Sequence, residues 1–172
     1  MGLFGSNKDD DGPWPVEVLT LDHRIAGELA PESRSMAWTY MQSDGPPPAG
    51  SFAIEVAEML PTGTRATPAA VGRLAHVRDG SGLVAILPRG GRTDEEWDKR
   101  IAGKDRASAT VVAGPYHLTG TLAFAGGKVE HVMHDRALHL LDVAITRTDG
   151  EGLTVTASRA TVFQNHVQAV LV

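Results

Sequence analysis

The chain has no cysteine among its 172 residues, and aromatic side chains are scarce, with three Trp, two Tyr and four Phe. The missing thiol excludes disulfide bonds, cysteine nucleophiles and thiolate-bound zinc or iron–sulfur sites. The sequence also contains no run of roughly 20 apolar residues, which a membrane-spanning helix requires. Residues 1–15 lack the apolar centre of a secretory signal. We therefore expect a cytoplasmic protein without a transmembrane segment.

Basic residues are fewer than acidic residues. Sixteen Lys and Arg stand against 21 Asp and Glu, which leaves a net charge of −5. An acidic excess disfavours a nucleic-acid partner, because binding to the phosphate backbone is driven by clustered cations. By contrast, 19 glycines and 10 prolines interrupt the chain often. This punctuation favours many short elements over a few long helices.

An internal repeat divides the chain into two similar parts. The segment 16–30 resembles 109–123, and later segments of the two parts also match. The clearest matches are Gly27 with Gly120, Glu55 with Asp142, and residues 83–87 with 167–171. Self-similarity of this kind is typical of a duplicated structural unit.

Each copy has the pattern of short β-strands. Apolar residues alternate with polar ones in residues 16–29 and 111–124, which is the period of a half-buried strand. We predict two opening strands, a third strand and a closing hairpin in each copy. The predicted turns are Leu21–His23, Gly114–Tyr116, Asp79–Gly82 and Asn165–His166.

A linker helix is predicted between the two copies. Thr93 and Glu96 have the spacing of a capping box, acidic residues crowd the first turn, and Gly103 can end the helix. We predict a helix over Asp94–Ala102, with Trp97 and Ile101 on its buried face. A second helical turn over Ser35–Met41 is possible, because the period there is ambiguous.

The strand pattern resembles the SH3-like small β-barrel, and in particular its Sm-like version. The residues that carry the resemblance are HRIAGEL (23–29), HLTGTL (117–122) and the ending FQNHVQAV (163–170). Some uncharacterised bacterial domains have a similar strand pattern. The resemblance implies a mainly β fold of two tandem SH3-like (Sm-like) barrels joined by a short α-helix. It also implies RNA binding as one function to consider.

The predicted organisation follows from the repeat. It comprises a flexible N-terminal arm (1–15), a first small barrel (16–91), a linker helix (92–108) and a second small barrel (109–172).

One cluster has the composition of a metal site. On a helix, His131, Asp135 and His139 would lie on one face, and His134 is close by. Imidazole and carboxylate ligands suit zinc or a similar cation, so a small metal-dependent enzyme is one alternative function. The repeat instead makes this segment a solvated loop that enters a strand, and we favour that interpretation. No nucleophile elbow, phosphate-binding loop or paired acid and base accompanies the cluster, so we expect no cofactor.

A basic patch supports the RNA-binding alternative. Its members are Arg89, Arg92, Lys99 and Arg100. Acidic residues at positions 94–96 and 98 are interleaved with these cations. We therefore favour a solvated helix surface over a nucleic-acid site.

The interpretation that we prefer is a non-enzymatic protein-interaction or scaffold module, as a subunit of a larger assembly. Small barrels leave sheet edges and apolar faces that another copy can cover, so self-association or a protein partner is expected. Trp14, Trp38 and Tyr40 are the predicted partner-binding residues, because aromatic side chains beside Pro and Gly make good anchors. The alternative for these residues is that they pack the N-terminal arm over the first barrel.

Overall fold

The computed structural model describes residues 12–42, 50–62, 74–78, 82–149 and 153–172. The described residues form ten strands in one antiparallel sheet, in the order β10-β6-β7-β8-β9-β5-β1-β2-β3-β4. The mainly β fold class is therefore confirmed. The strands are β1 (Pro15–Thr20), β2 (His23–Leu29), β3 (Ser51–Pro61), β4 (Leu74–Arg78), β5 (Leu83–Pro88), β6 (Asp105–Ala113), β7 (Tyr116–Phe124), β8 (Ala137–Arg147), β9 (Thr154–Phe163) and β10 (Val167–Leu171). The helices are α1 (Arg34–Tyr40) and α2 (Gly91–Ile101), with short 3-10 segments η2 (Pro31–Ser33), η3 (Val129–His134) and η4 (Gln164–His166).

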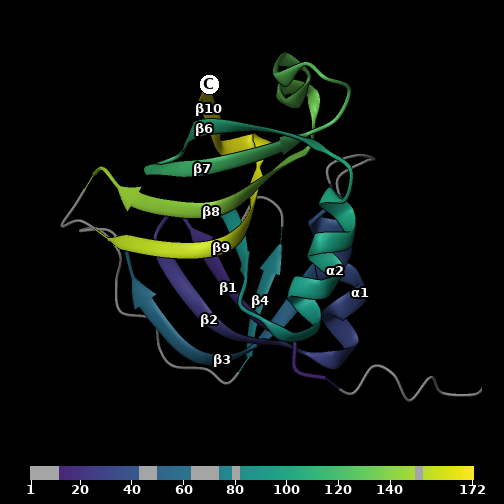
Figure 1. Cartoon of the computed structure of the whole chain (residues 1–172). Helices are drawn as coiled ribbons and strands as arrows, with labels where there is room; N and C mark the ends of the chain where they lie inside the picture. The colour runs from purple at the N-terminus through teal and green to yellow at the C-terminus, as the bar shows by residue number, and fades with distance from the viewer. Residues whose placement is uncertain (1–11, 43–49, 63–73, 79–81, 150–152) are drawn as a thin grey trace, which may run out of the picture.

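The sheet bends so that its two halves lie one above the other. Figure 1 shows β6–β9 in the upper part, β1–β3 in the lower part, and α1 and α2 together at one side. One core cluster lies mainly in the second half and includes Tyr116 and Leu118. The other lies mainly in the first half, where Phe52 packs edge to face against Tyr40 of α1, and it also includes Trp97 of α2 and Phe163 of β9. Both halves thus contribute side chains to a shared interior.

The two halves repeat the same strand pairing. Within the first half the order is β5-β1-β2-β3-β4, and within the second it is β10-β6-β7-β8-β9. Val18 pairs with Ile25 on one side and Ile86 on the other, as Val111 pairs with Leu118 and Val170. These registers agree with the sequence matches for the first, second and last strands.

The match between the third strands is wrong by one residue. Leu29 pairs with Ile54, and its counterpart Leu122 pairs with Leu140. Glu55 therefore corresponds to Leu141, and not to Asp142 as the sequence match had it. Both ladders have a β-bulge at the same place, next to Gly27 and Gly120, so that Ile54 corresponds to Leu140 before it and Glu58 to Ala144 after it. The sequence match instead aligned the similar runs Glu55–Ala57 and Asp142–Ala144, which lie one position out of this register.

The predicted closing hairpins are also wrong. β4 pairs with β3, whereas β5 pairs with β1 and β9. In the second half β9 and β10 are likewise not neighbours, and η4 separates them. Because β5 and β10 return to the first strand of their own half, adjacency in sequence does not become pairing in the sheet. Residues 79–81 of the predicted Asp79–Gly82 turn lie outside the described residues.

The described sheet has two ends, β4 and β10, and it is not closed. The division into two tandem small barrels therefore stays a prediction. β6 already begins at Asp105, inside the predicted linker 92–108. Of the predicted arm, residues 1–11 lie outside the described part of the chain.

Helix α2 is present where a helix was predicted, but it begins earlier, at Gly91. The Thr93–Glu96 capping box does not form. Thr93 is buried, and its hydroxyl donates to the carbonyl oxygens of Gly90 and Pro15. The Asp94 carboxylate accepts from the Gly90 amide at 2.9 Å and so provides the capping contact. Trp97 and Ile101 are buried as predicted.

Candidate interaction edges

The two end strands of the sheet are the strongest candidate site. Among the described strands, β10 pairs only with β6, and β4 pairs only with β3. An end strand presents alternate backbone N–H and C=O groups that its single neighbour cannot satisfy. Each edge can therefore accept a further strand.

The β10 edge is apolar and partly exposed. Leu171 is 60% exposed and Val172 is 68% exposed, while Val170 is half-buried. In the first half the equivalent strand β5 is buried along its whole length, because its side chains pack into both core clusters and β9 pairs with it at Ala85 and Ile86. β10, by contrast, packs against one core cluster only, through Val167 and Val170, and has no second neighbouring strand among the described residues.

The β4 edge combines an apolar and a cationic side chain. Leu74 is 44% exposed, and His76 and Arg78 are exposed on either side of the buried Val77. Short edge strands with a cation are protected against indiscriminate pairing. The large hydrophobic side chains that are exposed in the described residues are Leu60, Leu74, Met133, Leu171 and Val172, and three of these five lie on the two edges.

The junction between β5 and β9 shows how two such edges join. Ala85 lies opposite Val162, and Ile86 lies opposite Thr161. The indole N–H of Trp97 donates to the hydroxyl of Thr161 at 3.0 Å, which ties α2 to β9. The backbone ladder is short, so these side-chain contacts carry much of the junction.

Arginine side chains extend the same junction. Arg89 follows β5, donates to the Thr156 carbonyl oxygen at 2.8 Å and pairs with the buried Glu17 carboxylate at the same distance. Glu17 also accepts from Arg24, and this hydrogen bond raises the pKa of the Arg24 guanidinium. The two arginines neutralise a carboxylate that would otherwise be costly to bury.

Helix α2 is held to β9 by a second group of ion pairs. Arg159 donates to the Asp98 carboxylate at 2.8 Å and also contacts Asp94. Its hydrogen bond lowers the pKa of Asp98. These pairs lie partly in solvent, so each contributes little by itself.

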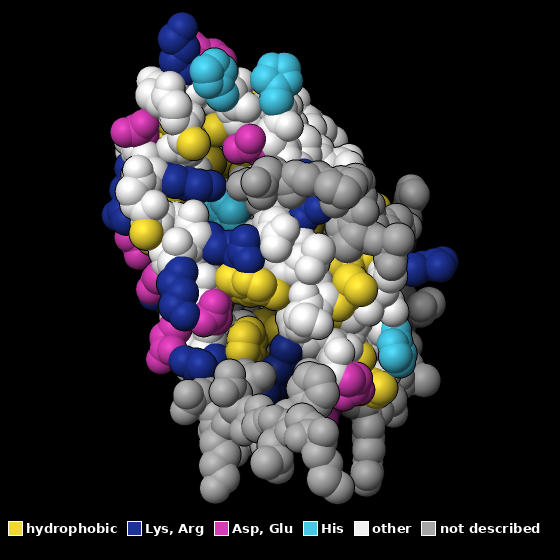
Figure 2. Space-filling view, turned by 90° about the vertical axis from the view of Figure 1, so that its right-hand side faces the viewer, with side chains coloured by type: hydrophobic (Ala, Val, Ile, Leu, Met, Phe, Trp, Pro, Cys, Tyr) yellow, Lys and Arg dark blue, Asp and Glu magenta, His cyan; other side chains and the backbone are white. Residues whose placement is uncertain are grey.

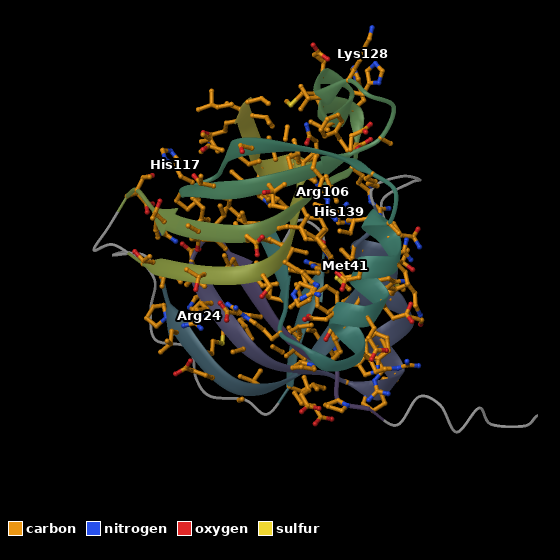
Figure 3. The ribbon with its side chains drawn as sticks, in the orientation of Figure 1. Arg24, Met41, Arg106, His117, Lys128 and His139 are labelled. Carbon is orange, nitrogen blue, oxygen red and sulfur yellow. The ribbon has the colours of Figure 1, made fainter. Side chains whose placement is uncertain are left out.

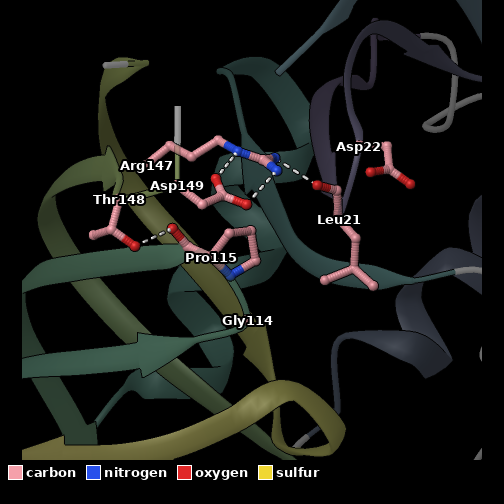
Figure 4. Close-up of a pocket in the computed structure, with 7 residues that line it drawn as sticks. All are labelled: Leu21, Asp22, Gly114, Pro115, Arg147, Thr148 and Asp149. Carbon is pink, nitrogen blue, oxygen red and sulfur yellow. Dashed lines mark hydrogen bonds and ion pairs between the residues drawn. The ribbon is translucent and has the colours of Figure 1, made fainter. Parts of the chain in front are cut away.

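A polar cluster around Arg147 also connects the two halves. Arg147 donates to the Leu21 carbonyl oxygen, to the Thr62 hydroxyl at 2.8 Å and to the Tyr116 hydroxyl. Burial raises the pKa of the Tyr116 hydroxyl. Figure 4 shows the adjoining pocket of about 700 Å³, in which Arg147 bridges Asp149 and the Leu21 backbone. With its charge paired inside the cluster, Arg147 joins the two halves.

His139 is a buried titratable group near α2. It is 1% exposed, its Nε2 lies 3.0 Å from the Met41 carbonyl oxygen, and its ring meets the Trp97 ring edge to face. Figure 3 shows it beside Met41 in the interior. Burial and the nearby Lys104 lower its pKa to about 4. The imidazole is therefore neutral at pH 7 and donates from Nε2.

The predicted metal ligands do not form a ligand set. His131 and His134 lie in η3 and are exposed, and Asp135 follows η3. Within the described ranges, no group of three His, Asp or Glu side chains is close enough to hold a metal ion. The metal site stays a prediction without structural support.

Only one of the three predicted aromatic anchors lies partly at the surface. Trp14 and Tyr40 are buried in the core of the first half, and the Tyr40 hydroxyl donates to the Gly50 carbonyl oxygen at 2.6 Å. Trp38 is half-buried beneath the Arg100 guanidinium, 4.3 Å from the ring centroid. The predicted partner surface therefore rests on Trp38.

The predicted basic patch is largely neutralised. Arg89 pairs with Glu17, Arg92 with Glu95, and Lys99 with Glu96. The fourth member, Arg100, stacks on Trp38. Figure 2 shows Lys and Arg side chains interleaved with Asp and Glu on the face that carries the helices. This arrangement lowers the positive potential that nucleic acid would need.

Comparisons with models of known protein families, with curated proteins and with solved structures gave no match to this chain. In the described part of the chain, neither helix has the length and apolar character needed to cross a membrane.

Sequence reasoning pointed to sheet edges in general but did not identify β4 and β10 as the edges. The missing information is the pairing of β5 with β9, a contact between strands far apart in sequence.

Proposed function

We propose that this protein is a non-enzymatic interaction module and a subunit of a larger assembly, built on two tandem small β-barrels of the SH3-like (Sm-like) type. Its binding surfaces are the β4 and β10 edges, which take up strands from a protein partner. The identical strand order of the two halves supports the tandem arrangement.

The observation that carries this proposal is the contrast between β5 and β10. The two strands occupy equivalent places, yet β5 is buried along its length and β10 leaves Leu171 and Val172 exposed. Burying a Leu or Val side chain stabilises an interface by roughly 1.5–3 kcal/mol. Strand addition would also satisfy the open backbone groups, which is a common mode of protein recognition.

The test is capture of partner proteins from extract of the cells that make the protein. We compare the unaltered chain with Val170→Lys on β10 and Leu74→Lys on β4, each checked for folding by circular dichroism. Met133→Lys is the matched control, because Met133 is exposed to a similar extent as Leu74 but lies on η3. Mass spectrometry then identifies and quantifies the captured proteins.

The expected result is a defined partner that binds the unaltered chain and Met133→Lys equally and is lost from an edge variant. A charge placed in a strand junction is desolvated without a counter-ion, so binding should fall by about tenfold or more. Equal capture by all four chains would show that the edges do not bind protein.

A further inference from the structure

We infer that the partner of each edge is a second copy of this chain, joined head to tail, with β10 of one molecule paired antiparallel to β4 of the next. This inference rests on the proposed function and names its partner. The expected register places Ala169 opposite Val77 and Val170 opposite His76 of the next molecule.

The register comes from the junction already present inside the molecule. β5 and β10 are equivalent, because Ile86 pairs with Val18 as Val170 pairs with Val111. Both strands also have the same bulge, after Leu83 in β5 and after Val167 in β10. Ala85 and Ile86 of the junction therefore correspond to Ala169 and Val170.

The other side of the junction maps in the same way. β4 and β9 are equivalent, because Val77 pairs with Phe52 as Val162 pairs with Leu138. Val162 and Thr161, which face Ala85 and Ile86, thus correspond to Val77 and His76. One copy of the chain carries both complementary edges, and each is of the kind that the β5–β9 junction joins.

The side chains favour this pairing over the symmetric ones. β10 has no charged side chain, so it places no charge against Arg78 of β4. Pairing β4 with β4 would bring two copies of Arg78 onto one ladder, and like charges that face each other across a ladder destabilise it. A head-to-tail contact leaves one edge open at each end of a dimer, so it continues into a ring or a filament.

The absence of cysteine makes the register directly testable. One sample carries only Val170→Cys and the other only His76→Cys, and the two are mixed under mild oxidation. Directly opposed residues bring their Cβ atoms within disulfide range, whereas residues displaced by two positions do not. We expect a covalent dimer between the two samples.

The register control replaces His76→Cys by Leu74→Cys, which lies two residues along the same edge. The yield of covalent dimer should be about tenfold lower for this pair, because its Cβ atoms are too far apart. The doubly substituted chain Ala85→Cys, Val162→Cys serves as a positive control, since this pair is opposed inside one molecule. Equal yields for the two mixtures, or none for either, would overturn the inference.

Failure of this inference differs from failure of the proposed function. If Val170→Cys and His76→Cys do not cross-link but the edge variants lose a different captured protein, the partner is not a second copy and the interaction module stands. If cross-linking fails and capture is equal in all variants, both are wrong.

A second experiment tests the head-to-tail direction. Val170→Lys blocks β10 and Leu74→Lys blocks β4, so neither variant alone can form the β10–β4 junction and each should stay a monomer. Mixed at equal concentration, they retain one intact β10 and one intact β4 and should form a heterodimer. Self-dimers of either variant, with no heterodimer in the mixture, would contradict the direction.

Discussion

At the residue scale, Gly27 and Gly120 allow paired strands to approach closely at the two β-bulges. A Cβ on Gly27 would lie 2.1 Å from the Glu55 carbonyl oxygen, and a Cβ on Gly120 would lie 2.6 Å from the Leu141 carbonyl oxygen. Real contacts of this kind do not approach so closely. Each glycine is therefore required for close approach of two backbones. The sequence match between Gly27 and Gly120 indicated that the position matters, although not why.

Gly27→Ala and Gly120→Ala should each destabilise the fold. The methyl group forces the second and third strands of its half apart, and overpacking of this type costs about 1–3 kcal/mol or more. The free energy of unfolding is measured by denaturant titration. Gly50→Ala is the control, because its Cβ would meet only the flexible end of Met36. A loss at Gly27 no larger than at Gly50 would contradict the close approach.

His139 should make stability depend on pH. Its pKa is about 4 in the folded protein and close to 6.5 in the unfolded chain. Between these values the unfolded chain binds a proton that the folded protein excludes. The free energy of unfolding should therefore fall as the pH is lowered from 6.5 to 4, by about 3 kcal/mol in total.

Comparison with two variants isolates this contribution. His139→Gln keeps a side chain that can donate to the Met41 carbonyl oxygen but cannot titrate, so it should flatten the curve over this range. His117→Gln, at an exposed position, should leave the curve unchanged. The same slope in His139→Gln and the unaltered chain would show that another group is responsible.

At the element scale, local pattern and long-range pairing were predictable to very different extents. Alternation of apolar residues correctly placed β1, β2, β6 and β7, because a half-buried strand leaves a direct period in the sequence. The alternation could not show that β5 pairs with β1 and β9 and not with β4. A hairpin of β4 with β5 would have the same pattern of apolar residues. The predicted start of α2 was wrong because the Gly90 amide is capped by the Asp94 carboxylate, a residue within the helix. The spacing of Thr93 and Glu96 in the sequence does not indicate this contact.

The candidate site also depended on contacts between residues that are far apart in the sequence. Burial of Trp14 and Tyr40 follows from the way α1 and the segment before β1 cover the first half, and no local signal distinguishes such a ring from an exposed anchor. Likewise, the sequence alone indicates a basic patch at Arg89, Arg92 and Lys99. Only the structure shows that each of these cations is paired with a carboxylate. Two of the interleaved acidic residues do pair with the patch, Glu95 with Arg92 and Glu96 with Lys99.

Helix α2 should be a principal support of the internal junction. Trp97 is fully buried and its indole N–H bonds to Thr161 of β9. We expect Trp97→Ala to lower the free energy of unfolding by about 3–5 kcal/mol. Trp38→Ala, which removes a half-buried ring and its stacked Arg100, should cost clearly less. Thermal and denaturant unfolding provide the measurement, and equal losses would contradict this role of α2.

At the scale of the whole molecule, one sheet joins two equivalent halves and ends in two complementary edges. The junction inside the chain shows that edges of these two types pair. Helix α2 contacts β9 at this junction, and the Arg147 cluster connects the two halves through Thr62. β10 and β4 repeat the arrangement without a neighbour among the described residues. The net charge of −5 and the paired arginines give little support to a nucleic-acid partner.

The most direct test of the account is the solution mass of the purified chain over a wide concentration range, by sedimentation equilibrium. We predict a mass that is a multiple of the 18.2 kDa chain and that falls to that of smaller species in Val170→Lys but not in Met133→Lys. A mass of one chain at every concentration would contradict self-association through the β4 and β10 edges.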